Sequence, residues 1–215
     1  MRYFEEYSRK FQADADIYLK IATCYLRLDK TAAAKKFLFM AIDENEYNEE
    51  VFYYLGECCQ KEGDFPNAIL YYKKAINLYP LREELFKGLG KTYFKMNKPE
   101  HARKYFQRMV DIGPDILDCW KTYIEFLYQI NELESALKVI DEASVYHDCS
   151  SLKFYKVAYQ VAMGKMAEAK YYLGEALEED FHGYRFLFEA EPRLSKMNEI
   201  TGFISEFEEK RHSIY

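Results

Sequence analysis

The chain has 215 residues, a formal net charge of −6 and a sequence pI of about 5.4. An acidic chain lacks the broad cationic face that binds a nucleic-acid backbone, so we expect no nucleic-acid partner. The N-terminus has no apolar signal-peptide core, and no run reaches about 18 apolar residues, so neither a secretory signal nor a membrane span is expected. Five cysteines without a C-x-x-C pair favour reduced thiols and a cytoplasmic location.

The first predicted element is an N-terminal helix in residues 1–14, with Phe4, Tyr7 and Phe11 on one side. When this segment is aligned with the repeats that follow, it corresponds to the second half of a repeat whose first half is absent. It is therefore predicted to be a partial repeat or a cap, and the chain could equally be part of a longer array. Self-association through this helix is a further possibility.

Residues 15–183 are predicted to form five repeats, because three columns of residues recur at spacings of 34, 34, 34 and 33. The repeats span 15–48, 49–82, 83–116, 117–150 and 151–183. Two columns hold mostly small residues: Ala34, Ala68, Ala102, Ala136 and Ala169, then Ala41, Ala75, Met109, Ala143 and Ala176. The third holds turn formers: Asp29, Gly63, Asn97, Asn131 and Gly164.

This periodicity predicts an all-α fold. Each repeat is read as two helices joined by a tight break, and neither helix can bury its apolar face alone. Gly, Asn and Asp tolerate the left-handed backbone that ends a helix. Small side chains let the paired helices approach closely, and stacked repeats are expected to share one continuous core without an internal boundary.

The last predicted element is a C-terminal cap in residues 184–215. A short helix ends at Pro192, and a second helix follows in which Ile200, Phe203, Ile204 and Phe207 recur at helical spacing. Its other face is charged. We expect this helix to cover the last repeat, and docking of a partner is the alternative.

The repeated residues follow one order: a large residue, Leu-Gly, Tyr, Ala, an aromatic, a second Ala and finally Pro. In one repeat these positions hold Phe52, Leu55, Gly56, Cys59 in place of Tyr, Ala68, Tyr72, Ala75 and Pro80. This order resembles the tetratricopeptide repeat (TPR) family over residues 15–183. The resemblance implies a TPR-type right-handed α-solenoid of antiparallel helix pairs with a C-terminal capping helix. It also implies a non-enzymatic scaffold for protein–protein interaction. The C-terminal tail resembles the ends of some bacterial TPR proteins.

In TPR proteins, one side of the first helix of each repeat does not face the core, and these sides line a concave groove. The resemblance therefore implies a partner site in that groove. We expect a protein or peptide ligand, acidic or with a free carboxylate. The predicted contact residues are Tyr53, Glu57, Lys87, Lys91, Phe94, Lys95, Lys121, Glu125 and Tyr128. The carboxylate clamp of chaperone-binding TPR domains is matched at Lys87 only, since Lys91 and Thr122 stand where that clamp has Asn.

Lys87, Lys91 and Lys95 lie at i, i+4 and i+8, where like charges destabilise a helix by about 0.2–0.5 kcal/mol per pair. Two interpretations remain open: Glu57, Glu84 and Glu125 neutralise the lysines, or the lysines bind a carboxylate of the partner. Gly88 also needs an explanation, because glycine inside a helix costs about 1 kcal/mol relative to Ala. It either leaves room for a ligand backbone or is tolerated variation.

We expect no enzyme, cofactor or metal site. The four histidines are isolated, and the chain has no phosphate-binding loop or dinucleotide fingerprint. Two alternative functions remain: a regulatory or scaffolding arm of a larger enzyme or assembly, and an RNA-processing scaffold. The second rests on Trp120, Tyr123 and Phe126, which resemble a half-a-TPR repeat, although Leu127 stands where that family has Glu.

Overall fold

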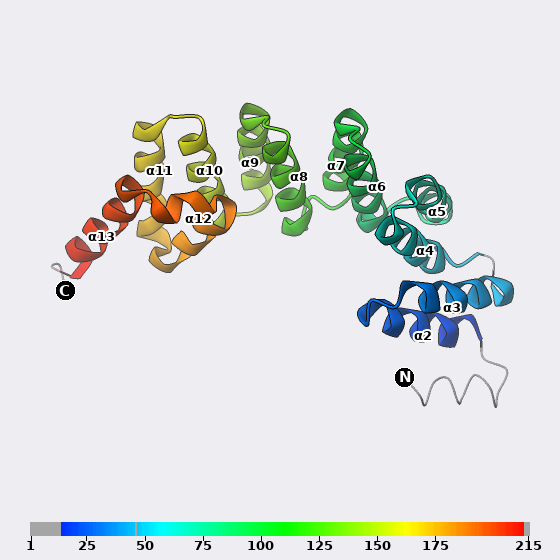
Figure 1. Ribbon diagram of the computed structural model, residues 1–215. Coiled ribbons are helices and arrows are strands. Elements are labelled where there is room, and N and C mark those ends of the chain that lie inside the picture. The colour runs from blue at the N-terminus through cyan, green and yellow to red at the C-terminus, as the bar shows by residue number, and fades with distance from the viewer. Residues whose placement is uncertain (1–13, 46, 213–215) are drawn as a thin grey trace. The chain divides into compact units, whose positions relative to one another are not determined.

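The computed structural model of the protein describes residues 14–45 and 47–212. The helix predicted in residues 1–14 lies, except for residue 14, outside this range. The described residues form helices and connecting turns, with no β-strand among them (Figure 1). They divide into two compact units, which lie within residues 14–112 (without residue 46) and 113–212, where one continuous core is expected from the repeats. Each unit packs its own successive helices together, so each buries its apolar surface internally.

In the first unit, each helix packs against the next along the chain. The pairs α2–α3, α4–α5 and α6–α7 are the antiparallel helix pairs of the predicted repeats (Figure 1). The helix bounds are Ala15–Arg27 for α2, Thr31–Glu44 for α3, Glu49–Glu62 for α4, Phe65–Leu78 for α5, Glu83–Lys95 for α6 and Pro99–Ile112 for α7.

The second unit begins with two more pairs, α8–α9 and α10–α11, and ends in a helical tail. Their bounds are Leu117–Gln129 for α8, Leu133–Tyr146 for α9, Ser150–Ala162 for α10 and Met166–Glu179 for α11. The tail comprises the 3₁₀ turn η1 (Phe181–Gly183), α12 (Tyr184–Ala190), the 3₁₀ turn η2 (Pro192–Lys196) and α13 (Asn198–His212). Helix α12 packs on α10, and α13 packs on α11.

The predicted breaks are confirmed, since all five turn formers adopt the left-handed backbone. Their φ angles are 57° at Asp29, 79° at Gly63, 57° at Asn97, 60° at Asn131 and 75° at Gly164. The following residue closes the helix with a hydrogen bond: the Asp64 N–H donates to the Cys59 carbonyl at 2.9 Å. This bond satisfies a carbonyl that the end of the helix would leave without a partner.

The two small-residue columns are also confirmed, because every member of both has no exposed surface. Large rings fill the space that the small residues leave. Tyr72 from α5 is fully buried against Gly56 of α4, and Phe106 from α7 packs against Gly90 of α6. In the pairs α4–α5 and α6–α7, the helices thus pack closely because a bulky ring of the second helix faces a residue without a side chain.

Candidate functional site

The structure places the nine predicted contact residues on three first helices. Tyr53 and Glu57 lie on α4, and Lys87, Lys91, Phe94 and Lys95 lie on α6, all in the first unit. Lys121, Glu125 and Tyr128 lie on α8, in the second unit. The two groups have different surroundings.

A buried hydrogen-bond network joins α4 to α6. The Gln60 amide nitrogen donates to the Gly88 carbonyl at 3.1 Å and to the Thr92 hydroxyl oxygen at 2.7 Å. The Thr92 hydroxyl in turn donates to the Gly88 carbonyl at 2.7 Å. At the edge of this network, the Lys95 ammonium donates to the Gln60 amide oxygen at 3.5 Å. The network holds the exposed Lys95 beside α4, and nothing in the sequence pattern singled out Thr92.

The carboxylates expected to neutralise the lysines have other partners. Glu57 accepts a hydrogen bond from the Tyr72 hydroxyl at 3.0 Å, and Glu84 pairs with Arg82 at 3.3 Å. Burial raises the pKa of Tyr72, so its hydroxyl stays protonated and acts as donor. Lys91 is exposed, and within residues 14–45 and 47–212 neither Lys91 nor Lys95 forms an ion pair. The described part of α6 therefore presents two ammonium groups one turn apart without carboxylate partners.

Tyr53 is half-buried at the edge of this face. The Arg82 guanidinium lies 5.1 Å from the centre of its ring, and the ring packs edge-on against Tyr54 at 5.0 Å. Burial raises the pKa of Tyr53. Its ring is thus already in contact with a cation of the chain itself.

Gly88 has a packing role that neither interpretation of the sequence named. A Cβ atom at Gly88 would lie 2.5 Å from the Cζ atom of Tyr72, and a Cβ at Gly56 would lie 2.7 Å from Cε1 of the same ring. One tyrosine ring therefore occupies the space of two absent side chains, one on α4 and one on α6. Gly88 makes room for this ring of the chain's own α5.

In the second unit, the predicted contact residues of α8 contact other parts of the same unit. The Lys121 ammonium lies 5.4 Å from the centre of the Phe186 ring in α12. Glu125 accepts a hydrogen bond from the Tyr155 hydroxyl of α10 at 3.1 Å. Tyr128 stacks on Tyr159 of α10, with ring centres 4.7 Å apart.

The Tyr128 hydroxyl also donates to Glu191, which follows α12. Glu191 is 5% exposed and accepts two hydrogen bonds from the Arg193 guanidinium, from Nε and Nη2, each at 2.8 Å. These bonds lower the pKa of the Glu191 carboxyl to about 2. In the sequence, the contact between Glu191 and Tyr128 could have been inferred only from a Glu that precedes a Pro and has an Arg two residues later. That pattern is too weak to predict a partner on α8.

The remaining chemistry of the described residues is sparse. No cluster of three or more His, Cys, Asp or Glu side chains able to hold a metal occurs in the part of the chain that the structure covers. No helix in that part has both the length and the apolar character needed to cross a bilayer. His147 lies with its Nε2 atom 3.0 Å from the Pro114 carbonyl. None of the five cysteines forms a disulfide.

Antiparallel helix pairs, left-handed breaks and a polar first-helix face define a helical-repeat protein. Two family models, both described as tetratricopeptide repeat, match residues 49–80 and 88–115. These two segments are TPR repeats, and the fold of the described residues is the all-α, TPR-type fold that the repeats predict. Proteins with this fold are, in general, scaffolds for protein–protein interaction.

Among curated proteins, Protein FlbA of Caulobacter vibrioides is 26% identical over 118 residues, which cover 55% of this chain and 20% of FlbA. The chain thus spans about a fifth of that relative. Among solved structures, YrrB, whose description reads "a TPR protein with an unusual peptide-binding site", has a TM-score of 0.59 at 17% identity. The match covers 88% of this chain and 97% of YrrB. PilF of Pseudomonas aeruginosa has a TM-score of 0.62 at 18% identity, over 86% of this chain and 85% of PilF. At these identities the structures establish the fold alone.

Proposed function

We propose that the chain is a non-enzymatic scaffold that binds an acidic peptide segment of a partner protein on the first-helix face of α4 and α6. One observation carries the proposal: the exposed Lys91 and Lys95 stand one helical turn apart with no carboxylate partner among the described residues. The nearby Glu57 and Glu84 bond to Tyr72 and Arg82 instead.

A carboxylate ligand would stabilise this arrangement. Like charges at i and i+4 destabilise the helix by about 0.2–0.5 kcal/mol, and a bound carboxylate removes that repulsion. Charge-assisted hydrogen bonds are shorter and stronger than neutral ones. The contact of Lys95 with Gln60 holds one ammonium near the neighbouring helix, which reduces the entropy lost on binding.

The first unit is the better place for this ligand than the second. On α8, Lys121, Glu125 and Tyr128 contact α10, α12 and Glu191 of the same unit. On α6, Lys87, Lys91, Phe94 and Lys95 are the residues that we propose to contact the partner, with Tyr53 and Glu57 of α4 at the border. YrrB, a protein of the same fold, is described as having a peptide-binding site, which supports a peptide as the ligand. We propose the cytoplasm as the location of this interaction, because five cysteines without a C-x-x-C pair favour reduced thiols.

The test is fluorescence anisotropy of the full chain with a pool of labelled nine-residue peptides that carry three Asp or Glu residues and a free C-terminal carboxylate. A matched pool carries Asn and Gln with an amidated C-terminus. The double variant Lys91→Glu/Lys95→Glu should bind the acidic pool at least tenfold more weakly than the wild type. Lys104→Glu/Arg108→Glu is the matched control, because both residues are exposed and lie at i and i+4 on α7. Equal binding by both double variants would refute the proposal.

A further inference from the structure

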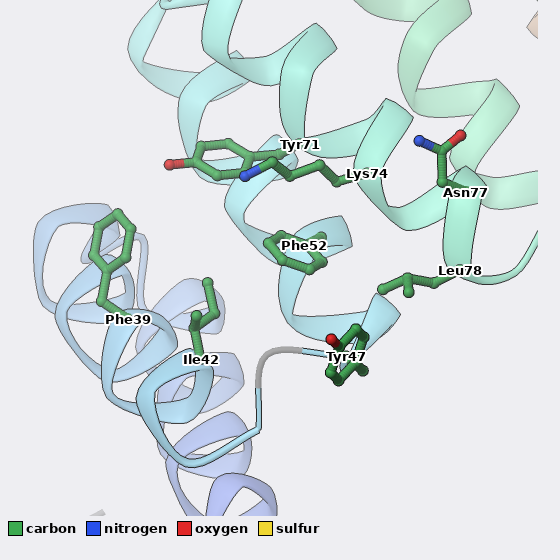
Figure 2. A pocket seen from close by; sticks show the side chains of 8 residues that line it. All are labelled: Phe39, Ile42, Tyr47, Phe52, Tyr71, Lys74, Asn77 and Leu78. Atoms are coloured by element: carbon green, nitrogen blue, oxygen red, sulfur yellow. The ribbon is translucent and has the colours of Figure 1, made fainter.

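A second surface of the first unit, with a different chemistry, lies between α3 and α5. A cavity of about 520 Å³ opens there. Figure 2 shows Phe39 and Ile42 of α3 on one side of it, facing Phe52 of α4 and Leu78 of α5 on the other. Phe39 is 44% exposed and Leu78 is 38% exposed, so both apolar side chains reach solvent at the cavity. The cavity therefore has apolar walls that the described residues do not cover.

One cation stands at the edge of this apolar space. The Lys74 ammonium lies 5.4 Å from the centre of the Phe52 ring and 5.8 Å from that of Tyr71 (Figure 2). The two rings stack with their centres 6.3 Å apart, so they present a continuous aromatic surface to the ammonium. Lys74 forms no ion pair with any residue in the described ranges, and none of the described residues that line the cavity carries a carboxylate.

The next repeat keeps the two aromatic residues, with Phe86 in register with Phe52 and Tyr105 in register with Tyr71, but it differs at other positions of the cavity. Thirty-four residues after Phe39 stands Lys73, and 34 residues after Lys74 stands Arg108. The residue in register with Asn77 is Asp111, which places a carboxylate three residues after the cation, on the same helix. The apolar side chain of Phe39 and a cation without a carboxylate three residues after it thus occur together at the α3–α5 position and not at the same positions one repeat later.

We propose that this cavity is a second binding site, for a short segment of a partner protein that carries two apolar side chains next to a carboxylate. The apolar side chains fill the space between Phe39, Ile42 and Leu78, and the carboxylate pairs with Lys74. Most of the lining comes from the second helices α3 and α5, with Phe52 from α4, and none of the lining residues is among those that we propose to contact the acidic peptide. The two sites therefore consist of different residues and can be tested separately.

The size and the charge of the cavity select this occupant. Pockets for ligands usually measure about 300–1,000 Å³, and a cavity in this range accommodates more than one side chain. Amphipathic segments dock in such grooves through apolar side chains three or four positions apart. Lys74 lies at the edge of the apolar cavity without an ion-pair partner among the described residues. A segment with an acidic residue next to its apolar side chains would therefore form an ion pair with Lys74, and a segment with a basic residue there would not.

The experiment titrates the ¹⁵N-labelled full chain with synthetic nine-residue peptides, followed by heteronuclear NMR. The probe peptide has Phe and Leu three positions apart and Asp directly after Leu, with Ser or Ala elsewhere, and the matched peptide has Lys in place of Asp. We expect the acidic peptide to shift the amide signals of Phe39, Phe52, Tyr71 and Lys74. The Lys peptide should bind at least tenfold more weakly.

The variant Lys74→Glu should reverse this preference, and Phe39→Ala should weaken both peptides at least fivefold. Both residues are exposed, so both variants are expected to fold, which circular dichroism will verify. Lys73→Glu is the matched control, since Lys73 is the adjacent exposed lysine and does not line the cavity. Lys91→Glu/Lys95→Glu should bind this peptide like the wild type, which separates the two proposals.

Three results would overturn the inference: no shift of the cavity amides by either peptide, unchanged preference in Lys74→Glu, or equal loss in Lys73→Glu. Shifts of the same amides on raising the protein concentration without peptide would also overturn it, because a second copy of the chain would then be the occupant.

Discussion

The ring of Tyr72 lies where a side chain at Gly88 would have to be, with its Cζ atom 2.5 Å from an ideal Cβ position on that glycine. The ring cannot easily move away, because it is fully buried and its hydroxyl donates to Glu57. Gly88→Ala should therefore lower the free energy of unfolding by about 1–2 kcal/mol, despite the better helix propensity of Ala. Urea unfolding followed by circular dichroism measures this change.

Gly202→Ala is the control for this substitution. Gly202 lies inside α13, and a Cβ atom there would meet nothing within 4 Å. The same exchange should here raise the free energy of unfolding by up to about 1 kcal/mol, since only helix propensity changes. A Gly88→Ala variant as stable as the wild type would show that the ring is not held in place.

The buried carboxylate of Glu191 should make stability depend on pH. Its hydrogen bonds with Arg193 lower its pKa from the ordinary value of 4.5 to about 2. A carboxyl with a lowered folded-state pKa contributes stability above pH 4.5, and this contribution is lost as the pH falls from 4.5 towards 2. At pH 7, Glu191→Gln should lower the free energy of unfolding by about 1–3 kcal/mol.

The difference between the wild type and Glu191→Gln should shrink progressively as the pH falls from 4.5 to 2.5, as measured by urea unfolding at several pH values. Comparison of the two proteins at each pH cancels the titration of the other acidic residues. A difference that stays constant from pH 7 to pH 2.5 would contradict the lowered pKa.

Two buried glutamines should respond in opposite ways to the same substitution. The Gln160 amide oxygen is buried without a hydrogen-bond partner among the described residues. An unsatisfied buried polar group costs about 1–3 kcal/mol, so Gln160→Leu should raise the free energy of unfolding by about 1 kcal/mol. Gln60→Leu should lower it by about 1–3 kcal/mol, because it removes the two hydrogen bonds that Gln60 donates, one to Thr92 and one to the Gly88 carbonyl. Thermal melts of both variants test this contrast, and destabilisation by Gln160→Leu would refute it.

The cysteines should differ in reactivity. Burial raises the pKa of Cys58 to about 12, and it also raises the pKa of Cys59. Thiol reagents attack the thiolate, so these two residues should stay unmodified in the folded protein. Iodoacetamide at pH 8 should label the half-buried Cys24 and Cys149 first, and Cys58, Cys59 and the buried Cys119 only in urea. Peptide mass mapping measures the order, and early labelling of Cys58 would contradict the expectation.

The sequence by itself determined the helix pairs. Turn formers such as Asp29 and Asn131 recur at the repeat period. Each adopts a left-handed backbone conformation, which depends only on the residue itself and its neighbours in the sequence. Columns such as Ala34 and Ala68 mark buried crossings, because only small side chains allow such close packing. Period and residue type carry this information directly, so the all-α fold could be predicted without any tertiary contact.

Only the tertiary structure decided which side chains meet across helices. The fit of Tyr72 between Gly56 and Gly88, the bond from Tyr128 to Glu191, and the cavity beside Lys74 all join residues from different elements of the chain. No periodic pattern encodes such contacts, because they depend on how individual side chains fill the space between helices. For the same reason, the sequence could name Lys91 and Lys95 as candidates, but the structure was needed to show that Glu57 and Glu84 have other partners.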